Sequence, residues 1–429
     1  PGRALRSDPL AVPTCGNASA GCEIDLTVGS VAVVSLHTSP LAQPGTGDAG
    51  GMNVYVRELS ASLAQAGVDV RVYVRRWADH LPDRVRVEPG FEVVHVSAGP
   101  AELAKEDLPS VIGEFGDGVA ADLAAAPVQA LHANYWLSAV AAHDLKHRLD
   151  LPLVATFHTL ARVKATAGDH EPPAREAAEA TVIGCCDAIC ASNPVEADQL
   201  VQLYGARPDR IELVPSGVDH AFFSPGDRAG ARAALGLDDR PTMLFVGRIQ
   251  PLKGLTVAVE SLARLADKRT RLVVVGGPSG ADGPAELRRV QERIRALGVA
   301  ERVQFVDPQP HHMLSSWYRA ADVVVVPSRS ESFGLVALEA AACGVPVVAS
   351  AVGGLRTLVV PGVTGMLVES RDPESFAAAI ASVLTDPVRA AAMGAAAAEE
   401  SRRYSWSTTA ARLRRLYADL SVRTPVACA

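Results

Sequence analysis

The sequence lacks the segments that would tie the protein to a membrane or to an export route. It has no apolar run of the roughly 18 residues that a membrane-spanning helix needs, and its first residues are not a basic segment followed by an apolar one. We therefore expect a cytoplasmic protein without a membrane partner. The formal net charge of −7 also argues against nucleic acid as a partner, because the phosphate backbone selects basic surfaces.

The cysteines are few and show no spacing typical of a zinc site. There are seven, an odd number, and we expect most of them to be reduced and inert. They are Cys15, Cys22, Cys185, Cys186, Cys190, Cys343 and Cys428. The sequence therefore names no metal ligand.

Length and composition indicate a two-domain enzyme. A chain of 429 residues exceeds what one hydrophobic core usually supports, and 48% hydrophobic with 21% charged residues is ordinary for a globular enzyme. Residues 1–28 are rich in Pro, Gly and Ser and aperiodic, which predicts an extension with little fold content. The turn-rich stretch 220–230 favours a boundary there. We expect an N-terminal domain over 29–220 and a C-terminal domain over 221–404.

Both halves alternate strand patterns with helix patterns. In the first half, a buried strand (28–36) is followed by a glycine-rich loop (37–51), a helix (52–67) and an alternating strand (68–74). The second half repeats this alternation from residue 242 onward. Further strands are expected at 93–99, 128–134, 153–160, 242–248, 271–277, 303–307, 323–327, 347–350 and 362–368, and further helices at 254–266, 284–297, 312–320 and 373–400. The fold class is therefore α/β, with two Rossmann-like domains facing a central cleft.

One stretch, residues 326–350, combines a buried strand, a polar turn and a helix. Glu331, Ser332, Phe333 and Gly334 would lie at the carboxyl end of the strand, where open α/β sheets bind ligands. The backbone N–H groups of residues 332–336 would offer a helix N-terminus to an anion such as a diphosphate. Glu339, eight residues after Glu331, would lie on nearly the same helix face. The pattern favours a sugar nucleotide, although a charged helix start and a solvated surface carboxylate would look the same.

The segment matches a family pattern, E-x-F-G-L-V-x-L-E-A followed by G-x-P-V-V-A. It resembles the retaining family 4 glycosyltransferases, which have the two-domain GT-B fold. The resemblance implies that Glu331 contacts the hydroxyls of the donor sugar and Glu339 the ribose, with Ser332, Phe333, Gly334 and Leu335 around the donor. It also implies that the amphipathic helix 406–420, within 405–429, crosses back onto the first domain.

Arg248 and Lys253, in FVGRIQPLKG, follow a strand of the second half. Two fixed cations can hold a diphosphate and stabilise the charge that builds on it as a leaving group. A surface turn with two basic residues is the alternative. The resemblance implies that both side chains bind the donor pyrophosphate.

The loop GTGDAGGMN (45–53) contains the G-x-G-x-x-G of a dinucleotide site, which keeps a nicotinamide-dependent oxidoreductase open, with Asp69 roughly placed for the ribose. Its glycines begin eight residues after the strand, too late for the tight turn that this fingerprint requires. The full string 37–56 instead resembles the branch of the family that glycosylates D-inositol 3-phosphate in mycothiol biosynthesis. That resemblance implies two sets of residues. Near the acceptor are His37, Asp48, Ala49, Gly50, Met52 and Asn53, and near the donor are Gln43, Pro44 and Gly51.

Four residues match the acceptor motifs of that branch: Lys105, Tyr135, Thr159 and Arg175. Two cations with two hydroxyls make a phosphomonoester site. His158 matches a histidine that the family places against the 6-hydroxyl of the donor sugar. Asn134 departs from the branch, which has histidine there, and residues 165–174 form a shortened segment.

These patterns lead to one hypothesis with open alternatives. The leading one is transfer of N-acetylglucosamine from UDP to 1D-myo-inositol 3-phosphate with retention, catalysed by Arg248, Lys253, Glu331 and His158. A transferase of secondary metabolism with another UDP- or GDP-linked sugar and a neutral acceptor, or a silent binding module, would share the fold. The absence of a D-x-D pair at a strand end argues against the metal-dependent single-domain class. Magnesium near Tyr318, Arg319 and Ala321 is suggested by resemblance only, and a homodimer is left open.

Overall fold

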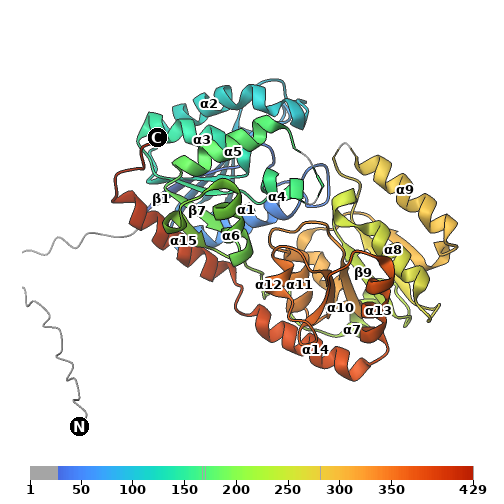
Figure 1. Cartoon of the computed structure of the whole chain (residues 1–429). Helices are drawn as coiled ribbons and strands as arrows, with labels where there is room; N and C mark the ends of the chain where they lie inside the picture. Colours follow the sequence, from blue (N-terminus) through green and yellow to red (C-terminus); the bar gives the residue numbers. More distant parts are fainter. Residues whose placement is uncertain (1–27, 167, 170, 281, 429) are drawn as a thin grey trace, which may run out of the picture.

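The computed structural model describes residues 28–166, 168–169, 171–280 and 282–428. Within them the chain forms two α/β domains, each built on its own sheet (Figure 1). Residues 1–27 of the expected N-terminal extension, with Cys15 and Cys22, lie outside the described residues, as do positions 167 and 170 of the shortened segment 165–174. The expected fold class, α/β with two Rossmann-like domains, is confirmed.

The first sheet has eight strands in the order β3-β4-β2-β1-β5-β6-β7-β8. All pairs are parallel except β3 with β4, which is antiparallel and closes one edge. The strands are β1 (Ser30–Val34), β2 (Asp69–Arg75), β3 (Arg84–Glu88), β4 (Phe91–Val96), β5 (Ala130–Asn134), β6 (Leu153–Thr156), β7 (Ala188–Ala191) and β8 (Ile211–Leu213). Because the sheet is covered on both faces, its inner strands are continuous apolar runs such as Val31–Val34.

Alternate residues of this sheet feed two separate cores. Ala32 and Val34 pack with α2, α3 and α5 on one face, while Val31 and Val33 pack with α1 and α15 on the other. The helices are α1 (Gly51–Gln65), α2 (Ile112–Ala125), α3 (Trp136–Leu149), α4 (Ala161–Thr166), α5 (Pro173–Cys185), α6 (Pro194–Tyr204) and α15 (Trp406–Ser421), with the short 3₁₀ turns η1 (Lys105–Val111) and η2 (Pro208–Arg210).

The second sheet is fully parallel, in the order β11-β10-β9-β12-β13-β14. Its strands are β9 (Thr242–Val246), β10 (Arg271–Val275), β11 (Val303–Val306), β12 (Val323–Val326), β13 (Val347–Ser350) and β14 (Gly365–Val368). The helices of this domain are α7 (Arg228–Ala234), α8 (Leu255–Arg264), α9 (Gly283–Ala296), α10 (Leu314–Ala320), α11 (Leu335–Ala342), α12 (Leu355–Leu358), α13 (Pro373–Leu384) and α14 (Pro387–Ser401), with the turns η3 (Pro251–Lys253), η4 (Ala300–Arg302) and η5 (His311–Met313). Both faces are again covered, by α8, α9 and α13 on one side and α10 and α11 on the other.

The C-terminal helix α15 crosses back to the first domain, as expected (Figure 1). Its Leu413 and Tyr417 belong to the apolar core of the first sheet. The Tyr417 hydroxyl lies 2.6 Å from Nδ1 of His132 on β5, so the polar tip of a fully buried tyrosine has a partner. The chain thus leaves the first domain near Val218 and returns near Ser405, and these two crossings pair in a β-bridge.

Most predicted elements lie within a few residues of their observed bounds. The helices expected over 373–400 are α13 and α14, which are separated at Asp386 because Pro387 starts α14. The hairpin strand β3 was not predicted, although its alternation (RVRVE) and the turn at Gly90 are visible in the sequence. Among the described residues, no single helix is long and apolar enough to cross a membrane. Only the pair α13 and α14, bent by 97°, meets the length and composition test together.

Candidate active site

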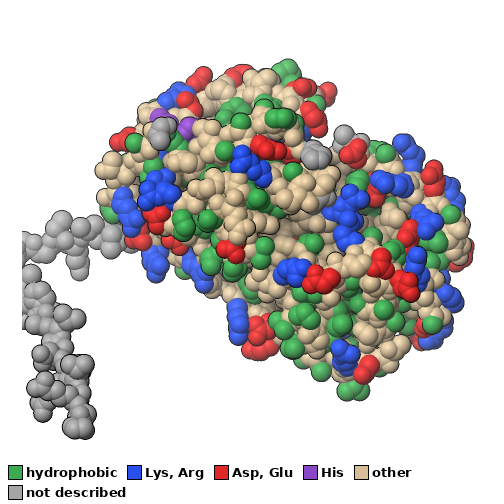
Figure 2. All heavy atoms as spheres, viewed as in Figure 1, with side chains coloured by type: hydrophobic (Ala, Val, Ile, Leu, Met, Phe, Trp, Pro, Cys, Tyr) green, Lys and Arg blue, Asp and Glu red, His purple; other side chains and the backbone are tan. Residues whose placement is uncertain are grey.

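A cavity lies between the two domains, at the carboxyl ends of strands from both sheets. The loop before α1, the first turns of α1 and the ends of β6 and β7 line it from the first domain, and the segments after β9, β10 and β12 line it from the second. Figure 2 shows a groove between the domains, with basic side chains beside it on the second domain. Of the residues expected around the donor, the cavity is lined by Pro44, Gly51, Arg248, Lys253, Glu331, Ser332, Phe333, Gly334, Leu335 and Glu339.

The segment after β12 turns sharply before α11 begins. Gly334 has φ +105°, in the left-handed region that glycine tolerates, and α11 begins at Leu335. Glu331 therefore lies in the turn, four residues before the helix. The expectation that Glu331 and Glu339 share a helix face is wrong, because Glu331 lies in the turn and only Glu339 lies in the helix. The two carboxylates nevertheless reach the same cavity.

Lys253 and Glu331 form an ion pair across the cavity wall. Lys253 Nζ lies 2.8 Å from Glu331 Oε2, which also accepts a hydrogen bond from Ser328 Oγ at 3.2 Å. Lys253 follows β9 in the turn η3, and Gly254 behind it packs its Cα against the Pro327 carbonyl, where a Cβ would lie 2.2 Å from the oxygen. The close approach of these two turns brings Lys253, which is predicted to bind the phosphate, next to Glu331, which is predicted to bind the sugar.

Arg248 is partly buried against the first domain. Its Nη1 donates to the Asp48 carbonyl at 3.4 Å, and a Cβ on Gly50 would come within 3.2 Å of its Nε. Burial lowers the pKa of the guanidinium. Within the part of the chain that the structure describes, no carboxylate lies within 4 Å of Arg248, so the charge is available to an anionic ligand.

Glu339 is held by two residues that the sequence analysis did not connect with it. His311 Nε2 lies 2.7 Å from Glu339 Oε1, and the Tyr318 hydroxyl donates to Oε2 at 2.8 Å. Burial alone would lower the pKa of His311, but the Glu339 carboxylate outweighs it and the pKa is raised. His311 stands in η5, more than twenty residues from Glu339, and no local spacing could have signalled the pairing.

Tyr318, Arg319 and Ala321 do not form a cation site with free ligands. The Tyr318 hydroxyl is used by Glu339, and Ala321 is fully buried. Arg319 donates to the carbonyl oxygens of Phe222 (2.5 Å) and Ser224 (2.8 Å), holding the segment that enters the second domain. Their side chains therefore offer no free ligand to a magnesium ion, and a ligand from this segment would have to be a main-chain carbonyl.

The glycine-rich loop of the first domain reaches across to the second. Gln43 Nε2 donates to the Pro308 carbonyl at 2.8 Å, and the Ser279 hydroxyl donates to the Gly47 carbonyl. Ser332 makes a third link, since its hydroxyl donates to the His158 carbonyl and its own carbonyl accepts from Asn193 Nδ2 at 2.6 Å. The domains are thus in contact around the cavity.

Asn53 fixes the shape of this loop. Its side chain accepts from the Gly50 N–H at 2.8 Å and donates to the Ser39 carbonyl at 2.6 Å. Ala49 is buried, and its carbonyl accepts from the Gly45 N–H. The polar atoms of Asn53 are thus used inside the loop. Asn53 was expected near the acceptor, and in this structure its side chain supports the loop. The loop itself is long and open, without the tight strand-to-helix turn of a dinucleotide site.

The predicted acceptor residues converge on Tyr135. The Arg175 guanidinium lies 5.0 Å from its ring and donates to its hydroxyl at 3.2 Å, and Lys105 Nζ lies 5.7 Å from the same ring. Arg175 also donates to Thr159 Oγ1 at 3.1 Å, and the His37 ring centroid is 4.4 Å from that of Tyr135. Thr159, Gly50 and Met52 line the cavity directly.

Neither predicted acceptor cation is unpaired. Arg175 is almost fully buried, with Glu179 Oε1 at 2.8 Å from its Nε and Glu171 Oε1 at 3.1 Å from its Nη1. Lys105 Nζ has Asp48 Oδ1 at 3.5 Å. The two cations of the expected phosphomonoester site are therefore already paired with carboxylates before an acceptor binds. The i+4 spacing of Arg175 and Glu179 on α5 was visible in the sequence.

His158 is a partly buried, neutral histidine beside the cavity. Burial lowers its pKa to about 3, and its Nε2 lies 2.9 Å from Asn134 Oδ1. Asn134, the position at which the resembled branch is expected to have histidine, thus contacts the imidazole of His158. Asn134 Nδ2 and His37 Nδ1 are buried without a hydrogen-bond partner among the described residues, which marks this wall as a place for polar ligand groups.

Backbone strain concentrates at this wall. In the described part of the chain, positive φ outside glycine occurs at Tyr135 (76°), Asp150 (51°) and His158 (61°). Two of these three are candidate site residues, and such strain persists only where the surroundings enforce it. Tyr135 and His158 follow the ends of β5 and β6, and His158 lines the cavity.

Comparison with known proteins identifies this architecture. The family model described as Glycosyltransferase Family 4 matches residues 49–222, and the model described as Glycosyl transferases group 1 matches residues 227–400. A D-inositol 3-phosphate glycosyltransferase 2 of Catenulispora acidiphila is 48% identical over 89% of this chain and 92% of its own length. A D-inositol 3-phosphate glycosyltransferase of Kribbella flavida is 47% identical over 90% and 95%. The chain belongs to the family 4 glycosyltransferases.

Solved structures agree with this glycosyltransferase fold. Sucrose-phosphate synthase of Thermosynechococcus elongatus matches with a TM-score of 0.87 and 33% identity, over 91% of this chain and 99% of that one. HepE of Anabaena, solved with UDP and glucose, matches with a TM-score of 0.74 and 19% identity over 91% and 100%. The cavity of the glycosyltransferase is therefore its candidate active site.

Proposed function

We propose that this glycosyltransferase moves N-acetylglucosamine from UDP-N-acetylglucosamine to 1D-myo-inositol 3-phosphate with retention of configuration and release of UDP. One observation carries the proposal. Lys253, Arg248 and Glu331 share one cavity with the acceptor-type residue Thr159, while Tyr135 and Arg175 stand directly behind Thr159. The names of the relatives, which are nearly half identical over almost the whole chain, supply the acceptor.

The second domain is assigned to the donor. Arg248 and Lys253 would bind the diphosphate, and the N-terminus of α11 adds backbone donors for its oxygens. Glu339, oriented by His311 and Tyr318, would accept the ribose hydroxyls. Glu331 would accept hydrogen bonds from the hydroxyls of the transferred sugar once the phosphate draws Lys253 away from Glu331. HepE, which has the same fold, was solved with UDP-glucose.

The first domain is assigned to the acceptor. Lys105, Tyr135, Thr159 and Arg175 would hold the phosphomonoester, with the buried Arg175 positioned by Glu179. The nucleophilic inositol hydroxyl would attack from the side on which UDP leaves, so the departing phosphate oxygen takes its proton. Arg248 and Lys253 would stabilise the charge on that phosphate in the transition state. Contacts such as Gln43 with Pro308 keep the domains closed and exclude water from the donor.

The test is a matrix of nucleotide sugars and acceptors, read by product mass and by NMR of the new glycosidic linkage. We expect UDP-N-acetylglucosamine with inositol 3-phosphate to give the highest kcat/KM and an α-linked product. Lys105→Met should lower kcat/KM about tenfold or more for inositol 3-phosphate and much less for myo-inositol. Turnover of a neutral acceptor with no activity on inositol 3-phosphate would refute the acceptor.

A neutral acceptor is the second candidate, because both predicted acceptor cations are already paired with carboxylates. Arg175 is already neutralised by Glu171 and Glu179, and Lys105 is close to Asp48. If the acceptor carried no charge, these pairs would stay intact during binding. Salt would then leave the KM of the acceptor unchanged, whereas a phosphorylated acceptor should show a KM that rises with ionic strength.

A further inference from the structure

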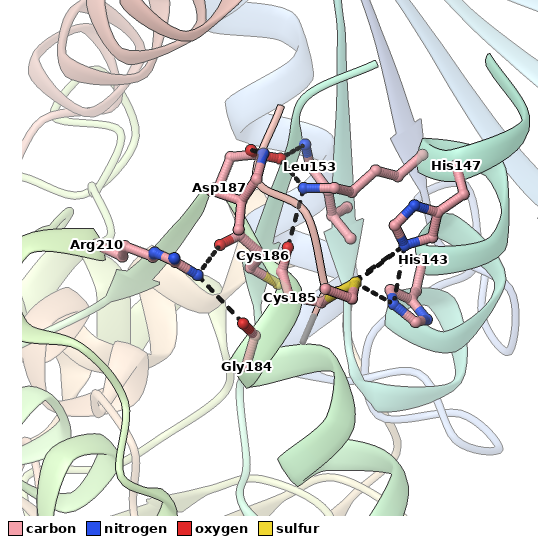
Figure 3. Close-up of a disulfide and its surroundings, with 11 residues drawn as sticks. His143, His147, Leu153, Gly184, Cys185, Cys186, Asp187 and Arg210 are labelled. Carbon is pink, nitrogen blue, oxygen red and sulfur yellow. Dashed lines mark hydrogen bonds and ion pairs between the residues drawn. A yellow bond between two sulfur atoms is a disulfide. The ribbon is translucent and has the colours of Figure 1, made fainter. Parts of the chain in front are cut away.

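Two histidines and two cysteines meet on the first domain, far from the cavity. His143 and His147 are one turn apart on α3, Cys185 ends α5, and Cys428 lies in the tail after α15. One ligand atom from each lies within 4.8 Å of all the others. Figure 3 shows both imidazole rings turned toward the sulfur atoms. In Figure 2, histidine side chains reach the surface in the region where Figure 1 places the C-terminus.

The structure joins Cys185 and Cys428 in a disulfide, so these two are exceptions to the expectation that most of the cysteines are reduced and inert. Sequence spacing could not reveal the pair, because 243 residues separate the two positions. The remaining described cysteines, Cys186, Cys190 and Cys343, are free and buried. Burial raises the pKa of the Cys190 and Cys343 thiols to about 12, so those two are unreactive.

A disulfide alone does not account for the histidines. His143 Nε2 and His147 Nε2 are 3.3 Å apart, and both also approach Cys428 Sγ, at 3.3 and 3.0 Å. Cys185 Sγ lies 3.8 Å from His147 Nε2. A disulfide sulfur has no proton to donate and is a weak acceptor, so it gives little reason for two imidazole nitrogens to converge on it.

We infer that, in the dithiol form, His143, His147, Cys185 and Cys428 bind one zinc ion. Tetrahedral zinc with bonds of about 2.0 Å to nitrogen and 2.3 Å to sulfur places two nitrogens about 3.3 Å apart and nitrogen and sulfur about 3.6 Å apart. The observed 3.3 Å between the nitrogens equals the first of these values, and the nitrogen–sulfur distances of 3.0–3.8 Å lie on either side of the second. The two sulfurs, which are bonded to each other here, would move apart on reduction. Two imidazoles and two thiolates form a Cys₂His₂ donor set, which suits a closed structural zinc site.

Three ligands are held by the folded domain before the tail arrives. The Lys146 ammonium, between the two histidines in sequence, donates to the Cys185 carbonyl at 2.9 Å and to Asp187 Oδ2 at 2.6 Å. Arg210 donates to the Gly184 carbonyl at 3.1 Å, on the other side of Cys185. The ion would therefore find three positioned ligands and need only Cys428 from the tail.

The tail is aimed at the site by an independent contact. The Val426 N–H donates to Asp187 Oδ1 at 2.6 Å, two residues before Cys428. α15 packs on one face of the first sheet, and α3 and α5 pack on the other. Zinc at this position would fasten the end of the chain across the sheet, at the amino ends of β6 and β7 and away from the cavity. Its role is structural rather than catalytic.

Binding requires the dithiol and transfers no electrons. Reduction by a phosphine consumes one disulfide, one phosphine and one water, and gives two thiols and the phosphine oxide. Two thiols then release two protons as two thiolates and two neutral imidazoles bind Zn²⁺. The disulfide and the zinc site exclude each other, because a sulfur bonded to sulfur is no longer a thiolate ligand.

The experiment uses the full chain, reduced with tris(2-carboxyethyl)phosphine and titrated with Co²⁺ and then Zn²⁺. We expect one Co²⁺ per chain, with the visible absorption of a tetrahedral ion and thiolate charge-transfer bands that Zn²⁺ abolishes. His147→Ala and Cys428→Ser should each weaken metal binding by more than about 100-fold. Loss of a residue that only hydrogen-bonds to a metal ligand weakens binding by roughly 10- to 100-fold, and loss of a ligand itself should cost more. His80→Ala, an exposed histidine elsewhere on the domain, is the matched control and should bind like wild type.

A second readout follows the tail. Zn²⁺ should slow proteolysis and hydrogen exchange of residues 422–428 in reduced wild type but not in Cys428→Ser, which lies in an exposed segment and leaves the core intact. The inference is overturned if the reduced chain takes up no Co²⁺, or if both variants bind as tightly as wild type. Recovery of the Cys185–Cys428 disulfide without metal uptake after reduction would make the pair a plain disulfide.

Discussion

At the residue scale, Lys253 and Glu331 in the cavity form an ion pair that a bound ligand would have to separate. Lys253 and Glu331 neutralise each other at 2.8 Å, so neither is unpaired before the donor binds. A diphosphate would attract Lys253 and leave Glu331 for the hydroxyls of the sugar. In the proposed reaction the pair would therefore couple recognition of the phosphate to recognition of the sugar.

Lys253→Ala should lower kcat by about 10²-fold or more, because the lysine stabilises the leaving diphosphate more in the transition state than in the ground state. Steady-state kinetics at saturating donor measures this. Lys268→Ala removes an exposed lysine at the end of α8 and should leave kcat unchanged. Near-normal turnover of Lys253→Ala would remove Lys253 from the reaction.

Arg175→Ala should lower the free energy of unfolding by about 3 kcal/mol, because Glu179 remains fully buried after losing its cation. Arg148→Ala breaks exposed pairs with Asp117 and Asp144, which water screens, and should lower the free energy of unfolding much less. Equilibrium urea unfolding of the two variants gives both values. Equal stability of the two would mean that Arg175 is not a structural part of α5.

At the element scale, the turn before α11 decides where both glutamates stand. Gly334 takes φ +105°, and a Cβ there would lie 2.8 Å from Leu355 Cδ2 on α12. The glycine therefore lets α11 begin close to α12 and directs its N-terminus into the cavity. A side chain at this position would strain the backbone and push α11 away from α12.

Gly334→Ala should raise the KM of the nucleotide sugar at least about tenfold and destabilise the domain by about 1–3 kcal/mol. Gly298→Ala is the matched control, since Gly298 also has a positive φ (66°) but an added Cβ would meet nothing within 4 Å. It should lose some stability and keep its KM. If the KM of both variants stays at the wild-type value, the N-terminus of α11 does not bind the donor.

The sequence predicts elements better than it predicts the contacts between them. β1 and α1 follow from an apolar run and a helical repeat, because local burial dictates both. The start of α11 was predicted, but the place of Glu331 in the turn before it was not, because the sequence pattern does not show that the turn separates Glu331 from the helix face of Glu339. His311 with Glu339, and Cys185 with Cys428, meet only after packing, and no local pattern encodes such pairs.

At the scale of the whole molecule, α15 ties the end of the chain to the first sheet through a buried polar contact. His132 lies between Tyr417 Oη (2.6 Å) and Thr156 Oγ1 (2.8 Å) and is completely buried. Burial lowers its pKa to about 3. The folded protein therefore keeps His132 neutral at pH values where the unfolded chain would protonate it.

This lowered pKa predicts a stability that falls as the pH falls. Below the unfolded pKa of about 6.5 the unfolded chain binds a proton that the folded chain does not, so His132 contributes a loss of about 2 kcal/mol between pH 7 and pH 5. His132→Asn should reduce the decline measured by urea unfolding by that amount, whatever its stability at pH 7. Parallel pH profiles for the two proteins would contradict a neutral His132.

The paired crossings at Val218 and Ser405 make the second domain an insertion within the first. During synthesis, the ribosome would release the whole sugar-nucleotide half before it released α15, whose Leu413 and Tyr417 complete the first core. The nascent first domain would therefore wait, with one face of its sheet uncovered, until the second domain had folded. Chimaeras that exchange donor domains between relatives should cut the chain at both crossings, because a single junction would leave the first domain with a foreign closing helix.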